Sequence, residues 1–348
     1  MKNFFNNLDH TFIIAEAGSN WKAGSYEEDI EQAHQLIKIA AHSGADAIKF
    51  QTYRTDTVYV ENAGSSDYLS KHNIKENIND LFEYLSMPYD MIPKLSKFCK
   101  EENILFMSTP FSVNDAKEID PFVQIHKVAS FELNHIRLIE FLAQTKKPII
   151  LSTGASTYDE IDFAIKIINN FHNDVSLLQC TSKYPSPIEA LNLNIIPKMK
   201  SKYGITIGFS DHSMDPVIGP TLAIGLGAQI IEKHFTLDKN LRGPDHKFAL
   251  NPTELNQMIS SIRNAEKAKG HDEKKVFKDE EELQKFAKRS IQCIKEITKG
   301  DILKEGYNFD ILRPGKKLRG VEPRYLLDVE GKKSTKDVPI GEGILDYE

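Results

Sequence analysis

Several features are scarce or missing in this chain of 348 residues. Its three cysteines, Cys99, Cys180 and Cys293, lie far apart, so they form neither a CxxC pair nor a disulfide framework. No apolar run approaches the ~20 residues that a membrane-spanning helix needs. The first ten residues are too polar for a signal peptide. The sequence therefore predicts a cytoplasmic protein with no membrane partner.

The chain also lacks a large excess of charge of either sign. The chain has 44 basic and 50 acidic side chains, a formal net charge of −6. This balance argues against a nucleic-acid partner but leaves anionic small molecules open. Hydrophobic residues make up 40% of the chain and charged residues 27%, as in ordinary globular proteins, which excludes a mainly disordered chain.

Eight short apolar, β-rich segments alternate with amphipathic stretches. Each segment is typical of a strand buried on both faces, and residues 26–41 show an apolar period close to that of a helix. This alternation predicts an α/β fold, a (β/α)8 TIM barrel. The absence of GxGxxG after the first segment disfavours an open dinucleotide-binding sheet. The segments are 12–18, 47–53, 105–110, 125–130, 149–154, 176–182, 205–212 and 230–236.

The chain is predicted to have three parts. Residues 1–270 form the barrel, residues 271–288 a charged linker, and residues 289–348 a small β-rich domain with Gly- and Pro-containing turns. Residues 55–87 form a long, mostly polar insertion after the second strand. Long loops of this kind usually lie over the active site of a barrel.

Polar and ionisable side chains follow or end each predicted strand. The active site of such a barrel lies at the C-terminal ends of its strands, and burying so many polar groups without ligands would be costly. We therefore predict one site at this rim. The residues are Glu16, Lys49, Gln51, Thr109, Lys127, Ser130, Glu132, Ser152, Ser182, Tyr184, Ser210, His212, Glu232 and His234.

Two lysines stand among several hydroxyl groups in this set. Cations with hydroxyl donors suit a phosphate group, so Lys49 and Lys127 are candidate phosphate ligands. The alternative is that each lysine forms an interior ion pair, for example with Glu16 or Glu132.

Two histidines end adjacent predicted strands. His212 and His234 could hold one divalent ion of the kind that imidazole prefers, or they could form a hydrogen-bonded pair. Two reaction types then fit the rim residues. One is a Schiff-base aldolase that uses Lys49 or Lys127, and the other is a metal-assisted condensation of an enol phosphate with an aldehyde.

Longer motifs occur in order along nearly the whole chain: FIIAEAGSN, ADAIKFQTY, MSTPF, KVASFE, ILSTG, CTSKYPSP, IGFSDHS, GAQIIEKHFTLDK and GPDHKFALNP. Together they resemble the N-acetylneuraminate (sialic acid) synthase family. The segment KGDILKEGYNFDILRPGKKLRG resembles the SAF, or antifreeze-like, domain of that family. KVASFELNH, CTSKYP and LRPGKKLRGVEPRY are most similar to the branch for spore-coat polysaccharide biosynthesis.

The resemblance implies an enzyme that condenses phosphoenolpyruvate with an open-chain N-acetylated amino sugar. The sugar would be N-acetylmannosamine or a 6-deoxy diacetamido hexose, and the products a nine-carbon 2-keto sugar acid and phosphate. The resemblance further implies that His212 and His234 hold Mn(II), or else Mg or Co, and that Glu16 and Glu232 are the catalytic carboxylates.

Substrate-binding roles follow from the same resemblance. Glu132 and Asp245 match sugar-contacting positions, and Arg313 matches an arginine that the C-terminal domain supplies to the partner's barrel in a domain-swapped homodimer. Lys49, Thr109, Lys127, Ser130 and Ser152 match phosphoenolpyruvate positions. The rim position alone predicts four further substrate contacts: Gln51, Ser182, Tyr184 and Ser210. The competing hypotheses are a Schiff-base sugar-acid lyase on the same barrel and a non-catalytic sugar-binding protein.

Overall fold

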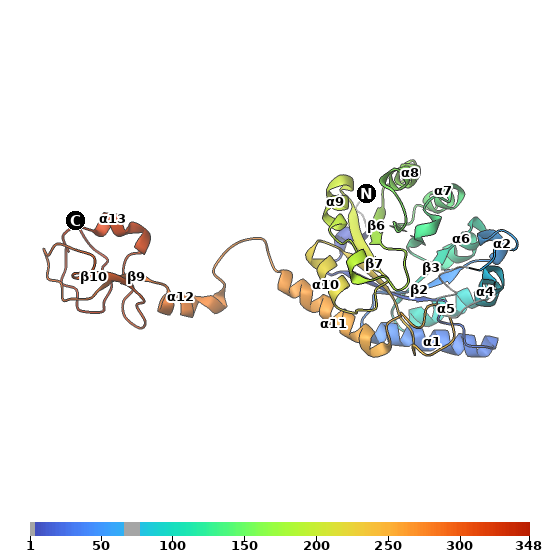
Figure 1. Ribbon diagram of the computed structural model, residues 1–348, viewed down its shortest axis with the longest axis horizontal. Helices are drawn as coiled ribbons and strands as arrows, with labels where there is room; N and C mark the ends of the chain where they lie inside the picture. Colours follow the sequence, from blue (N-terminus) through green and yellow to red (C-terminus); the bar gives the residue numbers. More distant parts are fainter. Residues whose placement is uncertain (1–3, 66–76) are drawn as a thin grey trace. The chain divides into compact units, whose positions relative to one another are not determined.

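The computed structural model describes residues 4–65 and 77–348 (Figure 1). The chain divides into two compact units, residues 1–270 and 271–348, and each is described by itself below. Within the described residues, no helix combines the length and the apolar character that crossing a membrane requires.

The first unit is built around eight parallel strands, as the sequence predicts. Their order is β3-β2-β1-β8-β7-β6-β5-β4, and β3 and β4 also lie side by side, so the sheet forms a nearly closed barrel. The predicted strand ends are correct to within two residues. The strands are β1 (Phe12–Gly18), β2 (Ala47–Thr52), β3 (Leu105–Pro110), β4 (His126–Val128), β5 (Ile149–Ser152), β6 (Val175–Cys180), β7 (Thr206–Asp211) and β8 (Ile230–His234).

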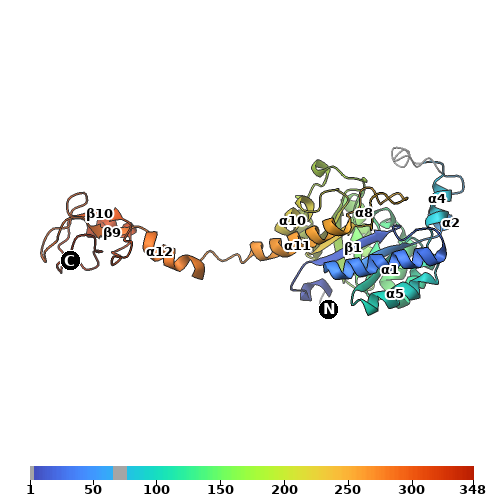
Figure 2. The ribbon, with the colours of Figure 1, turned by 90° about the horizontal axis from the view of Figure 1, so that it is seen from below.

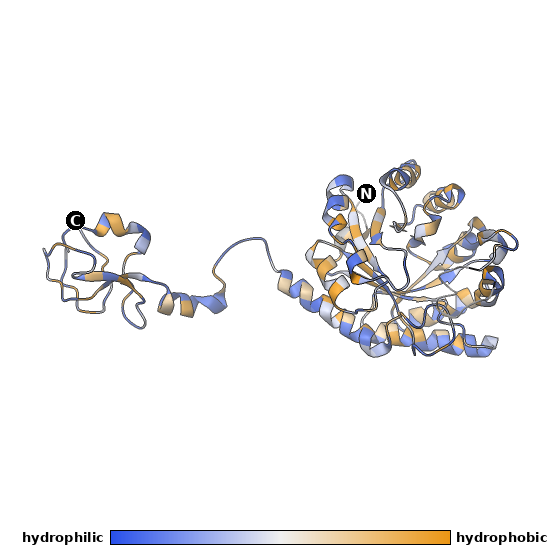
Figure 3. Cartoon of the chain, in the orientation of Figure 1, coloured by the Kyte–Doolittle hydropathy of each residue, from blue (hydrophilic) through white to orange (hydrophobic). Residues whose placement is uncertain are grey.

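Amphipathic helices surround the strands, and Figure 3 shows their stripes of hydrophobic and hydrophilic residues. Helix α1 illustrates why they form: Ser25 and Glu28 make a capping box at its start, and Gly44 ends it with φ 87°. Helices α1 and α5 lie side by side outside the strands (Figure 2). The helices are α1 (Tyr26–Ser43), α5 (Met91–Glu101), α6 (Val113–Ile119), α7 (Ile136–Gln144), α8 (Tyr158–Asn169), α9 (Ile195–Tyr203), α10 (Ile218–Gly225) and α11 (Pro252–Lys269).

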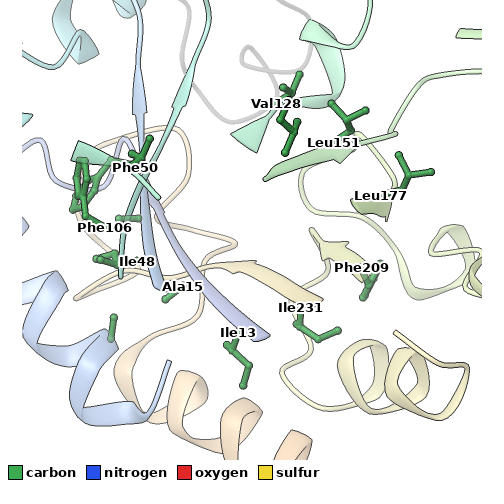
Figure 4. Packing of buried hydrophobic residues seen from close by; sticks show 14 of the residues in the cluster. Ile13, Ala15, Ile48, Phe50, Phe106, Val128, Leu151, Leu177, Phe209 and Ile231 are labelled. Atoms are coloured by element: carbon green, nitrogen blue, oxygen red, sulfur yellow. The ribbon is translucent and has the colours of Figure 1, made fainter. Parts of the chain in front are cut away.

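Side chains alternate between the two faces of each strand. Ile13 and Ala15 of β1 belong to the large core between strands and helices, which Figure 4 shows with residues of the other strands. Phe12 and Ile14 belong instead to a smaller cluster inside the barrel. Phe5, from the short 3-10 helix η1 (Phe4–Asn7), joins this inner cluster at the N-terminal ends of the strands. Polar residues line the barrel interior at the opposite end, where the C-terminal ends of the strands lie.

The insertion after β2 has an apolar cluster of its own. It contains the short helices α2 (Thr55–Val58) and α4 (Ile78–Leu85), while residues 66–76 of the predicted insertion lie outside the described residues. The base of the insertion is fastened by Arg54, whose Nη1 donates to the carbonyl oxygens of Tyr53 and Met87 at 2.6 and 2.9 Å. The cluster is formed by Tyr53, Ile78, Leu81 and Leu85, with Val58, Phe82 and Phe111 packed against it.

The second unit is small and rich in turns. Strands β9 (Ser290–Cys293) and β10 (Phe309–Leu312) pair in antiparallel register, and a core that includes Ile291, Phe309 and Ile344 lies beneath them. Elsewhere in this unit, Val338 and Ile297 form an isolated antiparallel bridge. The other elements are η5 (Lys278–Glu280), α12 (Glu281–Ala287), η6 (Pro323–Tyr325) and α13 (Leu326–Val329).

Candidate active site

Polar residues occupy the upper half of the barrel interior for a simple geometric reason. Along a strand, every second side chain points into the barrel. An apolar strand residue of the inner cluster is therefore followed, two positions later, by another inward-facing residue that lies nearer the C-terminal end. The strands thereby carry their polar groups to one rim. The pairs include Ile14 with Glu16, Ala47 with Lys49, Met107 with Thr109, Ile125 with Lys127, Ile150 with Ser152, Leu178 with Cys180 and Ile230 with Glu232.

A buried ion pair lies at the centre of this rim. Lys49 Nζ lies 2.5 Å from Glu16 Oε2 and donates to Thr109 Oγ1 at 2.9 Å. Gln51 Nε2 donates to the other Glu16 oxygen, Oε1, at 3.1 Å. The interior pairing of Lys49 with Glu16 that the sequence leaves open is therefore present. It is one part of a larger cluster.

The second lysine lies across the barrel. Lys127 Nζ donates to Ser152 Oγ at 2.7 Å and to the Val128 carbonyl at 2.9 Å. Glu232 lies between the two lysines, with its carboxylate oxygens 3.8 Å from Lys49 Nζ and 3.8 Å from Lys127 Nζ. Its Oε1 also accepts from Ser210 Oγ at 3.2 Å. Glu132, the other ion-pair partner that the sequence leaves open for the lysines, forms no ion pair with Lys127 among the described residues.

The two carboxyl groups differ in how readily they bind a proton. Burial raises the pKa of Glu16 to about 7, although the positive charge of Lys49 opposes the shift. Burial also disfavours the charged form of Glu232, but Lys127 and Lys49 outweigh it and hold its pKa below the usual value. Glu232 therefore keeps its charge near neutral pH, while Glu16 exchanges a proton there.

Three hydroxyl-bearing loops converge beside Lys127. Ser130, in the 3-10 helix η3 (Ser130–Glu132), accepts from the Gly154 amide at 3.0 Å. A Cβ atom on Gly154 would lie 2.3 Å from Ser182 Oγ and 2.9 Å from Ser130 Oγ. Ser182 Oγ is buried and has no hydrogen-bond partner in the part of the chain that the structure describes. The lack of a side chain at Gly154 thus lets both serine hydroxyls approach its backbone.

The two histidines meet at the ends of β7 and β8, with their ring centroids 5.6 Å apart. His212 Nδ1 lies 2.9 Å from the Thr181 carbonyl oxygen. Because a carbonyl only accepts, Nδ1 carries a proton. Burial disfavours the charged form of the His212 ring, but Cys180 and the Thr181 carbonyl outweigh it and hold its pKa above the usual value. Burial keeps the pKa of His234 well below its usual value, so this ring stays neutral. Its Nδ1 is buried without a hydrogen-bond partner among residues 4–65 and 77–348.

These two rings fit a divalent ion, because they lie close together and the hydrogen bond at His212 Nδ1 leaves its Nε2 as the atom available for a metal. No group of three or more His, Cys, Asp or Glu residues suited to a metal is found among the described residues. The remaining ligands would then be water or substrate oxygens, which is typical of a catalytic rather than a structural site. Tyr184 closes one side, with its ring centroid 4.1 Å from that of His212.

Residues on loops beyond the strands complete the rim. Asp245 accepts from Ser19 Oγ at 3.3 Å, and burial raises its pKa to about 6. Gly18, with φ +54°, lets three groups meet: a Cβ there would lie 3.1 Å from Asp245 Oδ2, 3.4 Å from Glu16 Oε1 and 3.5 Å from His234 Cε1. Only a residue without a side chain combines this backbone conformation with this close approach.

Glu132 lies at the edge of the same rim. Burial raises its pKa to about 7, although Lys127 opposes the shift, and its Oε2 atom finds no hydrogen-bond partner within the described ranges. Arg313 follows β10 in the second unit, where its side chain is exposed. Its part in the site stays a prediction.

Two residues near the histidines are absent from the sequence-based prediction. Cys180 Sγ lies 3.8 Å from His212 Nδ1, and the ring of Phe248 lies 5.2 Å from that of His234. The alternation of inward- and outward-facing residues along a strand could have identified Cys180, because it stands two positions after the inward-facing Leu178. Phe248 lies in a loop after β8, where no such alternation exists to predict its position.

Comparisons with known proteins give one consistent result. A model described as "NeuB family" matches residues 36–274. The spore coat polysaccharide biosynthesis protein SpsE of Bacillus subtilis is 36% identical over 96% of this chain and 92% of its own. A pseudaminic acid synthase of Campylobacter jejuni is 37% identical over 98% and 97%. The solved N-acetylneuraminic acid synthetase of Leptospira borgpetersenii superposes with a TM-score of 0.70 and 34% identity, over 79% of this chain and 90% of its own.

Proposed function

The chain belongs to the NeuB family, and from this premise we propose that it is a sialic-acid-type synthase. The reaction condenses phosphoenolpyruvate with an open-chain N-acetylated amino sugar, and it yields a nine-carbon 2-keto sugar acid and phosphate. The relatives named above as synthases of pseudaminic and N-acetylneuraminic acid support this class of reaction.

The observation that carries the proposal is the arrangement of Glu16, Lys49, Lys127 and Glu232 beneath His212 and His234. Two buried ammonium groups, flanked by hydroxyls, suit a small substrate that carries both a phosphate and a carboxylate. We assign phosphoenolpyruvate to Lys49 and Lys127, with Thr109, Ser130 and Ser152. Ser182 and Ser210 lie beside this set and are assigned to the same substrate pocket.

His212 and His234 would hold the divalent ion, for which Mn(II) is the first choice and Mg or Co are alternatives. When bound, the ion supplies Lewis acidity toward the aldehyde oxygen of the sugar. The chain's own part is to keep the His234 imidazole neutral and to fix the tautomer of His212. The hydrogen bond from His212 Nδ1 to the Thr181 carbonyl fixes that tautomer.

The bond changes balance with one water. C3 of phosphoenolpyruvate forms a bond to the aldehyde carbon, which leaves a cationic centre at C2. Glu232 keeps its negative charge and stabilises this cation. Glu16 takes a proton from the water that adds to C2, as its raised pKa allows. The former aldehyde oxygen takes up one proton of this water by way of Glu16 and becomes a hydroxyl group. The tetrahedral centre then expels phosphate by cleavage of the bond between C2 and the bridging oxygen, and its hydroxyl loses the second proton as the keto group forms.

The acceptor sugar is assigned to groups farther toward the C-terminal ends of the strands: Gln51 near the end of β2, Glu132 in η3, and Tyr184 and Asp245 in loops. We propose a 6-deoxy diacetamido hexose or N-acetylmannosamine as acceptor. The 37% identity to a pseudaminic acid synthase supports the first class. Residues 289–348 are proposed to be a SAF domain whose Arg313 reaches the partner's barrel in a domain-swapped homodimer. Both substrates are metabolites of the cytoplasm, where we propose that the enzyme acts.

The test is a purified full-length chain with phosphoenolpyruvate, Mn(II) and a panel of N-acetylated hexoses. Phosphate release and the mass of the product identify the reaction and the acceptor. Phosphoenolpyruvate labelled with 18O at the bridging oxygen should give labelled phosphate. The Schiff-base alternative has one observation in its favour, because burial lowers the pKa of Lys127. Covalent trapping of a keto acid by borohydride would establish it and overturn the synthase proposal.

A further inference from the structure

The ends of β7 and β8 present three successive residue pairs. Ser210 and Glu232 are register partners inside the barrel, and Asp211 and Lys233 are register partners one position further along. His212 and His234 follow. Because side chains alternate between faces, the first and third pairs point into the site, and the middle pair points outward. Both histidines therefore stand directly after one member of the outer pair.

The outer pair is a fully buried ion pair. Lys233 Nζ lies 2.6 Å from Asp211 Oδ2, and the two side chains are 1% and 0% exposed. Lys233 Nζ also donates to the Ser213 carbonyl at 2.7 Å and approaches Ser213 Oγ at 3.3 Å. Asp211 Oδ1 in turn accepts from the Ser213 amide at 2.8 Å. The residues on both sides of His212 are thus held by one lysine from the neighbouring strand.

Neighbouring groups pack closely around this ion pair. A Cβ atom on Gly219 of α10 would lie 3.0 Å from Asp211 Oδ2 and 3.2 Å from the ring of Phe209, so α10 packs directly against the carboxylate. The His212 carbonyl is fixed separately, since it accepts from the Ser186 amide at 2.8 Å. The backbone around His212 therefore has one defined position relative to β8.

Stability alone does not account for such a pair. A buried ion pair contributes little more than well-packed apolar residues of similar volume, because removing two charges from water costs about as much as their attraction returns. A lysine that binds a carboxylate, a carbonyl and a hydroxyl at once fixes position more tightly than an apolar side chain could. The geometry that it fixes is the spacing of two metal-binding candidates.

We propose that Lys233 is a positioning residue for the divalent metal site, and that it acts through Asp211 and Ser213 to hold His212 and His234 in register. The proposal rests on the proposed function, in which these histidines bind the ion. Lys233 itself touches neither substrate nor metal.

The experiment compares full-length variants with matched changes. Asp211→Asn combined with Lys233→Met removes both buried charges together and so leaves no unpaired one. Lys147→Met combined with Asp120→Asn is the control, because Lys147 also binds a carboxylate and a backbone carbonyl, but near the start of β5. Lys233→Arg restores a cation at the tested position.

Three measurements are made on each variant: thermal unfolding, Mn(II) affinity by electron paramagnetic resonance, and the His212 tautomer by 15N nuclear magnetic resonance without metal. We expect the double variant to fold, to bind Mn(II) about tenfold or more weakly, and to show mixed His212 tautomers. The control should match the wild type in affinity and tautomer, and Lys233→Arg should recover most of the affinity.

Wild-type Mn(II) affinity and an unchanged Nδ1–H tautomer in the folded double variant would overturn the inference. A double variant that fails to fold would also overturn it, since the pair would then be a requirement of the barrel. If the wild type binds no Mn(II), the metal part of the proposed function fails, and the tautomer measurement alone decides whether Lys233 positions His212. Condensation activity of the wild type tests the proposed function separately.

Discussion

Glu16 and Lys49 are register partners on neighbouring strands, and Glu16 Oε2 lies 2.5 Å from Lys49 Nζ. Lys49 is therefore paired before any substrate arrives. An anionic substrate at Lys49 must share this cation with Glu16. The added negative charge raises the proton affinity of the Glu16 carboxylate, which makes it a stronger base toward the water that adds to C2.

Replacing either buried lysine should weaken phosphoenolpyruvate binding. A charge-assisted hydrogen bond contributes ~1.5–3 kcal/mol, so Lys49→Met and Lys127→Met should each raise the dissociation constant about tenfold or more. Isothermal titration calorimetry with phosphoenolpyruvate measures this. Lys94→Met is the control, because that side chain is 49% exposed. Unchanged binding in both buried variants would make the lysines structural.

Removing the divalent ion should abolish turnover. Exhaustive treatment with EDTA is expected to stop phosphate release, and Mn(II) should restore it. His234→Ala should lose the ion but keep the barrel, because the residue stands at the rim rather than in the core. His42→Ala, at an exposed position of α1, is the matched control. Full activity after chelation would contradict the metal assignment.

Glu132 should make stability fall as pH rises. Burial raises the pKa of Glu132 to about 7 in the folded chain, whereas its value in the unfolded chain is 4.5. Between these two pH values, the folded chain keeps the proton and the unfolded chain loses it. The stabilisation that the protonated form provides is fully present below pH 4.5, and it is lost as the pH rises through about 7. The loss reaches about 3 kcal/mol, at 1.36 kcal/mol per pKa unit.

Glu132→Gln should therefore stabilise the first unit at about pH 8 and change little at about pH 4.5. Urea unfolding at the two pH values measures the difference. Glu101→Gln, at a side chain that is 53% exposed, should show no such dependence. An equal effect of Glu132→Gln at both pH values would count against the buried, unpartnered carboxyl as the cause.

Two inactive variants should complement one another if Arg313 acts on the partner's barrel. Arg313→Ala keeps an intact barrel, and His234→Ala keeps an intact second unit. A mixed dimer would then contain one complete site, with up to about half of the activity of a wild-type dimer, since the two sites of a twofold dimer are equivalent. Phosphate release after verified subunit exchange measures it, and no recovery would place Arg313 outside the partner's site.

The strands could be predicted from sequence because each is buried on both faces. An uninterrupted apolar run, such as 12–15, needs no knowledge of its neighbours to be recognised as a strand. The polar residues that end these runs, from Glu16 to His234, could be predicted on the same grounds. Their convergence follows from the barrel topology.

Contacts between distant segments could not be predicted in this way. The approach of Asp245 to Gly18 depends on how a loop after β8 returns to β1, and local patterns do not encode it. The pairing of Asp211 with Lys233 depends on strand register, and both residues interrupt the apolar pattern of an outward face. The apolar cluster around Tyr53 and Phe82 forms within an insertion whose composition is mostly polar.

Phe5 and the inner cluster fill the barrel at the N-terminal ends of its strands, so the interior opens at one end. Both substrates and both products must therefore use the same entrance. The groups assigned to phosphoenolpyruvate lie mainly on the strands, and those assigned to the sugar lie mainly on the loops beyond them. A bound sugar would then block the path of phosphoenolpyruvate, whereas the reverse does not hold. Under these assignments, we expect phosphoenolpyruvate to bind first and phosphate to leave last.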